Sequence, residues 1–254
     1  MPIPIAFISS AMPLSQHDSL SRMALPLLIL AACMLLWTDS VLAHAVTQGD
    51  KGYIQEITGT KIIPFIYLGA KHMVTGYDHI LFLLGVIFFL NGMKQIAGYV
   101  SLFAIGHSTT MLIGVYFDFG INSYIIDAVI GFSVAYKALD NLGAFERWFG
   151  YQPDTRVATL VFGFLHGFGL ASKIIEYDIS ADGLVPNLLA FNVGVEIGQL
   201  LALAAILVVM RYWRATASFV RQAYAANVVM MAAGFTLMGF QIAGFVVTEL
   251  AHVH

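Results

Sequence analysis

The sequence predicts an all-α integral membrane protein, a six-helix transmembrane bundle that follows an N-terminal signal peptide. Of its 254 residues, 59% are hydrophobic and only 11% are charged, and the mean hydropathy is +0.82. A soluble domain is typically about 25% charged. The apolar residues also occur in stretches long enough to cross a bilayer about 30 Å thick at about 1.5 Å per residue. Composition and stretch length therefore indicate the same class.

The first 43 residues have the pattern of a secretory signal peptide. Arg22 precedes an apolar run from Ala24 to Trp37, and the small-residue pattern Val41-Leu42-Ala43 follows it. Cleavage after Ala43 would make His44 the first mature residue. The run is shorter than the roughly 20 residues that a span needs. The alternatives are an uncleaved anchor, or a true start at Met12 or Met23.

A polar extracytoplasmic segment, residues 44–61, precedes a single transmembrane domain over residues 62–254. The six predicted spans are 62–91, 96–117, 122–143, 156–176, 184–210 and 223–250. The first is long and contains Gly76, so we expect either an oblique helix or a short half-helix followed by a span that begins near Tyr77. Gly194 and Gly198 in the fifth have the spacing that lets two helix backbones approach closely.

The loops predict the orientation. Basic residues fall in alternate loops, which the positive-inside rule assigns to the cytoplasm: Lys94, Arg147, Arg156, Arg211, Arg214 and Arg221. The other loops carry acidic residues, Asp118, Glu176, Asp178 and Asp182. We therefore expect a multi-pass protein of the bacterial inner (cytoplasmic) membrane with both mature termini on the extracytoplasmic side.

The composition also argues against several functions. The single cysteine, Cys33, lies in the signal segment, so the mature chain has no disulfide framework and no thiolate metal site. No basic patch indicates binding of nucleic acid. There is no phosphate-binding loop of the G-x-x-x-x-G-K type, so we expect no hydrolysis of nucleotide.

Six polar side chains inside the predicted spans form a candidate ligand set for a divalent metal: His72, Asp78, His79, His107, His166 and Glu196. A charged side chain at the membrane centre costs about 2.5–3.5 kcal/mol, so the two carboxylates need a cation or a proton. By residue count, three of the histidines fall near mid-membrane in three different spans. The alternative for each histidine is a hydrogen-bonded structural role.

The neighbours of these residues have predicted roles as well. His72 and His79 are two helical turns apart and share a face, and Asp78 can ligate the metal or orient an imidazole. Ser108 and Thr109, directly after His107, are candidates for the pathway, although such hydroxyls also bond to the preceding turn.

The fifth span and the termini supply further candidates. Asn192, Glu196 and Gln199 recur at i, i+4 and i+7. We expect Glu196 to act as a ligand or proton acceptor in a polar wall, with an interhelical hydrogen-bond seam as the alternative. Candidates for collecting metal at the entrance are His44, His252 and His254. At the end of the third span, Lys137 and Asp140 are close enough in sequence to pair.

The run from Gly69 to Leu84, with His72 followed by Gly76-Tyr77-Asp78-His79, resembles the signature of the HupE/UreJ family of membrane proteins. Residues 106–110, 162–169 and 191–199 are similar to further motifs of that family, so the resemblance covers roughly residues 65–210. It implies a signal peptide, a six-helix bundle and secondary permeation of nickel, or sometimes cobalt, for hydrogenase or urease maturation. Met73, where many members have proline, places the chain near a divergent branch.

Transport of a metal is the function that we expect. Imidazole and carboxylate ligands suit nickel, cobalt, zinc or copper, and the resemblance favours nickel. An inside-negative potential assists entry by about 2.3 kcal/mol per charge per 100 mV, so no ATPase partner is needed. The expected partners are the lipid bilayer, the metal ion, and a metalloenzyme maturation system or membrane enzyme complex.

Two other functions remain open at the level of sequence. One is a non-catalytic metal- or haem-binding accessory subunit of a membrane metalloenzyme. The other is an intramembrane zinc-dependent hydrolase, in which three histidines hold zinc and Glu196 or Asp78 acts on its water.

Overall fold

A computed structural model describes residues 58–90, 92–175 and 182–253, and this part of the chain is helical, as predicted. The helices are α3 (Ile62–Thr75), α4 (Tyr77–Ile87), α5 (Met93–Tyr116), α6 (Ser123–Asn141), α7 (Ala144–Phe149), α8 (Thr155–Ile175), α9 (Leu184–Arg214) and α10 (Phe219–Val253). The predicted signal peptide with its cleavage point, His44 and His254 lie outside the described residues, as does the side chain of His252.

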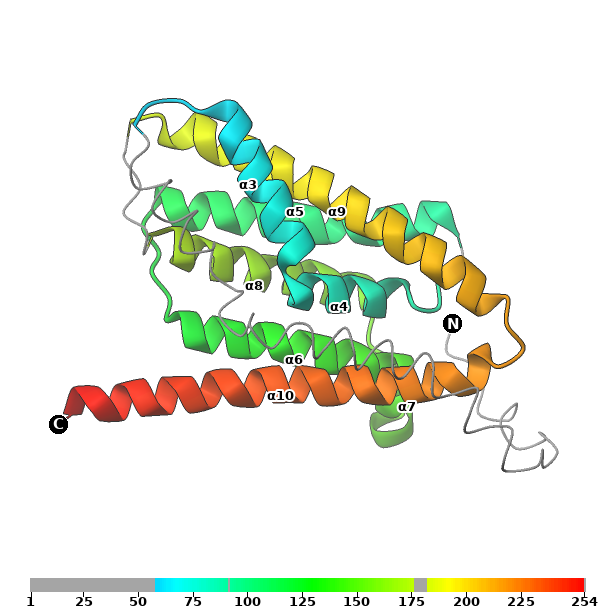
Figure 1. Ribbon diagram of the computed structural model, residues 1–254. Coiled ribbons are helices and arrows are strands. Elements are labelled where there is room, and N and C mark those ends of the chain that lie inside the picture. Colours follow the sequence, from blue (N-terminus) through cyan, green and yellow to red (C-terminus); the bar gives the residue numbers. More distant parts are fainter. Residues whose placement is uncertain (1–57, 91, 176–181, 254) are drawn as a thin grey trace.

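The long helices run back and forth between two ends of the bundle (Figure 1). End A holds the starts of α3, α6 and α9 and the ends of α5, α8 and α10. End B holds the starts of α5, α8 and α10 and the ends of α4, α6 and α9. The basic residues that were assigned to the cytoplasm from the sequence all lie at end B: Lys94, Arg147, Arg156, Arg211, Arg214 and Arg221.

Most of the packing is between three pairs of helices, α3 with α9, α5 with α8, and α6 with α10. Glycines mark the points of closest approach. A Cβ atom added at Gly194 of α9 would collide with the backbone of α3 at Ile66, and one added at Gly167 of α8 would collide with the carbonyl of His107 on α5. The predicted close packing at Gly194 and Gly198 is confirmed, since both lie against α3.

The first predicted span, 62–91, is broken into two half-helices. The α3 helix ends at Thr75, and Gly76 is extended, with its N–H donating to the carbonyl of His72 over 2.9 Å. The α4 helix then begins at Tyr77, at the place that one sequence alternative gave, but it ends at Ile87. At about 1.5 Å per residue it is roughly 16 Å long, too short to cross a bilayer alone. The break excludes the alternative of one oblique helix, and α4 is shorter than the span that the other alternative placed after Tyr77.

The α4 half-helix is enclosed by its neighbours. Its apolar residues Phe82, Leu83, Val86 and Ile87 belong to a buried hydrophobic cluster to which α5, α6, α8, α9 and α10 all contribute. At end B, the guanidinium of Arg214 donates to the carbonyls of Ile87, Phe88 and Leu90 over 2.6–2.8 Å. These carbonyls lie at and just beyond the end of α4, so a cation anchors that end.

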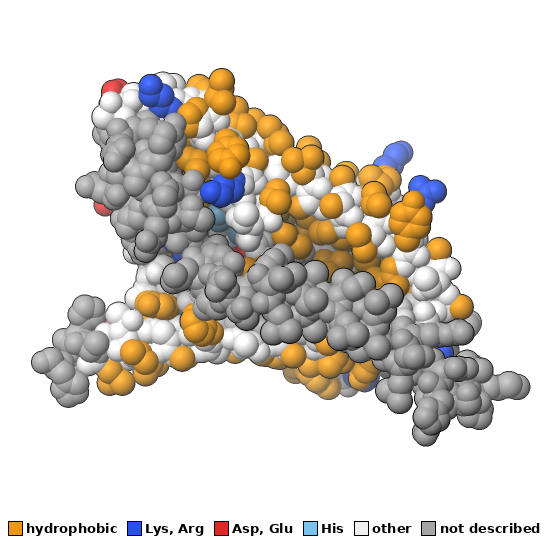
Figure 2. Space-filling model, in the orientation of Figure 1, with side chains coloured by type: hydrophobic (Ala, Val, Ile, Leu, Met, Phe, Trp, Pro, Cys, Tyr) orange, Lys and Arg blue, Asp and Glu red, His pale blue; other side chains and the backbone are white. Residues whose placement is uncertain are grey.

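Four described helices are long and apolar enough to cross a membrane: α5, α8, α9 and the part of α10 up to Leu250. Of the six predicted spans, the first is divided into α3 and α4, and the third, α6, carries three charged residues, Asp127, Lys137 and Asp140. Hydrophobic side chains cover much of the visible surface in Figure 2. The four long apolar helices and the hydrophobic surface suit a protein that is surrounded by lipid.

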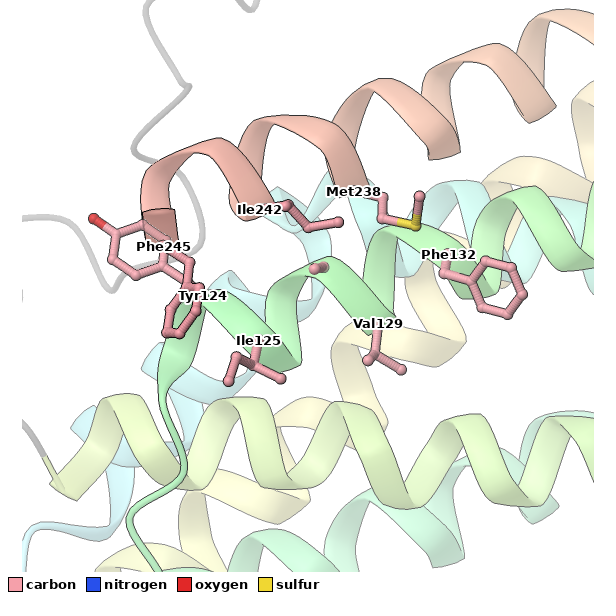
Figure 3. A pocket seen from close by; sticks show the side chains of 8 residues that line it. Tyr124, Ile125, Val129, Phe132, Met238, Ile242 and Phe245 are labelled. Carbon is pink, nitrogen blue, oxygen red and sulfur yellow. The ribbon is translucent and has the colours of Figure 1, made fainter. Parts of the chain in front are cut away.

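An apolar groove lies between α6 and α10 near end A (Figure 3). Its lining includes Tyr124, Ile125, Val129, Phe132, Met238 and Ile242. Because these side chains offer no carboxylate or imidazole, the groove is unsuited to a metal ion.

Candidate metal centre

Three histidines from three helices meet in the middle of the bundle. His72 lies in the last turn of α3, His79 in the first turn of α4, and His107 in the middle of α5. One ring nitrogen from each lies within 4.8 Å of the others, close enough to bind a single ion. His79 and His107 are buried, whereas His72 is half-buried. A small patch of histidine surface is visible on the face of the molecule that Figure 2 shows.

His166 of α8 completes the group. Its ring centroid lies 5.2 Å from that of His79, and the centroid of His79 lies 5.1 Å from His72 and 5.8 Å from His107. His79 is therefore the central member. The predicted convergence of His79, His107 and His166 is confirmed by these distances.

Hydrogen bonds fix the orientation of two of the rings. Nδ1 of His79 lies 3.1 Å from Oδ1 of Asp78, and Nδ1 of His166 lies 2.7 Å from the carbonyl oxygen of Phe162. A backbone carbonyl can only accept, so Nδ1 of His166 carries hydrogen, and Nδ1 of His79 carries hydrogen when Asp78 is ionised. In the neutral imidazole, the Nε2 atom of each ring then presents a lone pair. This arrangement, in which an outer acceptor holds a ligating imidazole, is common in metal sites.

His107 has no such outer acceptor. It is 1% exposed, and neither of its ring nitrogens has a hydrogen-bond partner among the described residues. A buried polar group without a partner costs about 1–3 kcal/mol by mutational data. A bound cation would satisfy one nitrogen of His107 and the equally unpartnered Nε2 of His79.

Close backbone packing places these rings. A Cβ atom added at Gly76 would lie 2.6 Å from Nδ1 of His79 and 3.1 Å from Oδ1 of Asp78. The break between the half-helices thus has no room for a side chain. On the other side, the hydroxyl of Thr110 on α5 donates to the carbonyl of Phe164 on α8 over 2.7 Å, which ties the helices of His107 and His166 together.

A phenylalanine lies about one turn toward end B from each of the three central histidines: Phe82 after His79, Phe103 before His107 and Phe162 before His166. The centroid of Phe82 lies 5.4 Å from Phe103 and 5.7 Å from Phe162. These three rings, the phenylalanine layer, separate the histidines from end B with apolar surface. A cavity of only about 10 Å³, lined in part by His79 and Phe82, lies in this region.

The structure corrects the prediction for the fifth span. Asn192 and Gln199 are buried, but Glu196 is exposed on α9, so the prediction that Glu196 lies in the bundle interior is wrong. The buried face of α9 includes Val195, and consecutive helical residues differ by about 100° in direction, which turns Glu196 away from α3. Gln199 donates to the carbonyl of Val100 over 3.3 Å.

The hydroxyls after His107 also differ from expectation. Ser108 is half-buried, and Thr109 is exposed on the outer surface of α5. The buried hydroxyl is that of Thr110, which was not singled out. The structure therefore does not bring Thr109 to the histidines.

Buried ion pairs were only partly foreseen. The predicted pairing of Lys137 with Asp140 is confirmed, and Gln152 and Thr155 also donate to the carboxylate of Asp140. A second pair, Asp127 with Lys173, was missed. The signal was present in the sequence, because Asp127 is a charged residue within an apolar stretch, like Asp78.

Fold and site together define a multi-pass membrane protein with a buried cluster of histidines that is suited to a metal ion. The chain belongs to the family described as HupE / UreJ protein, whose model matches residues 48–249. The match contains every helix from α3 to α9 and nearly all of α10. The family is associated with transport of nickel and cobalt. No curated protein and no solved structure matches the chain.

Proposed function

We propose that this protein is a secondary permease for a divalent transition metal, most readily nickel, and that the ion passes through a centre formed by His72, His79 and His107. The observation that carries the proposal is the meeting of three imidazole nitrogens within 4.8 Å inside a multi-pass membrane protein. His166 is the fourth candidate ligand, and Asp78 supplies charge and orientation through His79.

The ligand chemistry restricts the substrate to a class. Neutral imidazole binds nickel, cobalt, zinc and copper(II), and the Irving–Williams order means that affinity alone does not choose among them. The association of the family with nickel and cobalt favours these two. Magnesium and calcium prefer oxygen ligands, so the centre should discriminate against them.

The arrangement of the rings favours an ion over haem. The rings of His72, His107 and His166 all lie within 5.8 Å of His79, measured between centroids. A porphyrin between two axial histidines would need the rings to stand apart across an open gap. Mutual contact from several sides suits a single small cation.

We place end A on the extracytoplasmic side and end B in the cytoplasm. The basic residues collected at end B support this orientation through the positive-inside rule. In this orientation α3 and α4 together make one broken crossing, and α6 makes another, which gives six crossings with both mature termini outside. Broken helices at mid-membrane are typical of substrate sites in secondary transporters.

The test is uptake of Ni²⁺ into liposomes that contain the purified protein, an inside-negative potential and an entrapped metal-sensitive dye. Wild-type protein should give saturable uptake, and His79→Ala should abolish it because His79 contacts every other imidazole. Gln241→Ala, which removes a buried polar side chain from α10, is the matched control and should transport normally. Wild-type protein that binds Ni²⁺ but moves none would instead indicate an accessory subunit.

A further inference from the structure

A second buried charged group lies nearer end A and has no part in the histidine centre. The ammonium of Lys173 on α8 donates to both carboxylate oxygens of Asp127 on α6, over 2.8 and 3.0 Å. The side chains of Lys173 and Asp127 are 11% and 6% exposed. The two helices are thus joined by an ion pair that is largely withdrawn from water.

This pair lies in line with the histidines. Lys173 follows His166 by seven residues on α8, so the two share a helix face and are about 10 Å apart along the axis. Gly169 lies between them on that face, and a Cβ atom added there would be 3.8 Å from Oδ1 of Asp127. Asp127 therefore packs on the same side of α8 as His166, and nearer to end A.

Helix packing connects the pair with the centre. The α6 helix, which carries Asp127, also packs against α4, whose first turn holds Asp78 and His79. An ion that entered from end A would meet the carboxylate of Asp127 before it met the imidazoles.

Stability alone gives a weak reason for this pair. Removing two charges from water costs about as much as their attraction returns, so buried ion pairs are often replaced by apolar residues at no loss. What the pair does provide is a carboxylate that already holds one cation in an apolar setting. Lys173 lies in the last turn of α8, so its long side chain can swing toward the terminal carbonyls and the surface when released.

We propose that Asp127 is the first intramembrane binding point for the entering divalent cation, and that Lys173 occupies this carboxylate until the cation displaces it. This inference rests on the proposed function and on the placement of end A outside. The cation exchanges for an ammonium, so the charge beside Asp127 does not vanish at any stage. At this first point the cation is bound by a hard carboxylate oxygen. The histidines, which lie further from end A, then select the metal.

The test compares the KM for Ni²⁺ uptake into liposomes among variants of the two residues. Asp127→Asn should raise KM several-fold, because the entering cation loses its carboxylate. Lys173→Met should lower KM, because no ammonium then competes for that carboxylate. Lys173→Arg should raise KM, since a guanidinium binds a carboxylate through two hydrogen bonds and is harder to displace. Equilibrium affinity for Ni²⁺ in detergent, which reports the histidines, should stay unchanged in all three.

The double variant Asp127→Asn/Lys173→Met leaves no unpaired buried charge and protects the test against misfolding. It should fold normally and show the raised KM of Asp127→Asn. The opposite result would be that Asp127→Asn and Lys173→Met each raise KM and lower the melting temperature, while the double variant recovers wild-type KM. The ion pair would then only join α6 to α8, and the inference would be wrong. Wild-type uptake by His79→Ala would contradict the proposed function itself, and with it the role of Asp127 as the first binding point.

Discussion

Nδ1 of His79 lies 3.1 Å from the carboxylate of Asp78, the residue directly before it. Neighbouring residues on a helix point about 100° apart, and here both lie in the first turn of α4, where no preceding helical turn covers them. The break at Gly76 provides that turn in the middle of the bundle. The carboxylate therefore fixes which nitrogen of His79 faces the other imidazoles.

We predict that Asp78→Asn lowers the affinity for Ni²⁺ by about 10- to 100-fold, the usual effect of losing an outer-shell partner of a metal ligand. The amide oxygen can still accept from His79, but it adds no negative charge. Titration calorimetry in detergent measures the change. An affinity equal to that of wild type would show that Asp78 neither orients His79 nor balances the charge of the ion.

Gly76→Ala should weaken metal binding, because the new Cβ would lie 2.6 Å from Nδ1 of His79 and must displace the ring. The matched control is Gly98→Ala, since a Cβ at Gly98 meets nothing within 4 Å. We expect the control to keep wild-type affinity, and an alanine within a helix is more favourable than glycine by about 1 kcal/mol. Equal affinity in both variants would contradict the geometry at the break.

Truncation of the phenylalanine layer should increase the maximal rate of Ni²⁺ uptake without changing the equilibrium affinity. Phe103→Leu shortens a side chain that separates His107 from end B, and thus lowers the apolar barrier to exit. Phe132→Leu, at a side chain that is 38% exposed beside the groove between α6 and α10, is the control and should transport like wild type. A slower rate for Phe103→Leu at equal protein content would mean that the layer does not limit exit.

Glu196→Gln should leave the affinity for Ni²⁺ within about twofold of wild type, because the side chain is exposed on α9. His107→Ala, by contrast, removes one of three converging imidazoles and should abolish high-affinity binding. The same calorimetric titration compares the two variants. A large loss of affinity in Glu196→Gln would show that this carboxylate reaches the ion after all.

The sequence predicts the site best where a polar side chain lies in an apolar span, because burying such a side chain in lipid costs free energy. His79, His107 and His166 could be assigned to one site because an imidazole in an apolar span needs a partner, and depth can be counted along the chain. The face of a helix is harder to predict. In α9 the exposed and the buried positions are both apolar, so hydrophobicity did not reveal that Glu196 points away from α3.

The end of a helix inside an apolar run is also hard to predict. Residues 62–91 form one largely apolar stretch, and a glycine within a membrane helix is tolerated without a break. At the break, Asp78 and His79 fill the space where a side chain at Gly76 would lie, and the hydropathy of the stretch carries no sign of this contact. Contacts between distant parts of the chain also decide that Asp127 pairs with Lys173 instead of a nearer lysine.

The three helix pairs have a consequence for synthesis in the cell. None of them joins neighbours in the sequence: α3 packs on α9, α5 on α8, and α6 on α10. As the chain emerges, all four histidines of the centre have been made by residue 166, yet α3 still lacks α9, the helix against which it packs. The histidine centre therefore cannot take its final form until α9 has been made and has packed against α3.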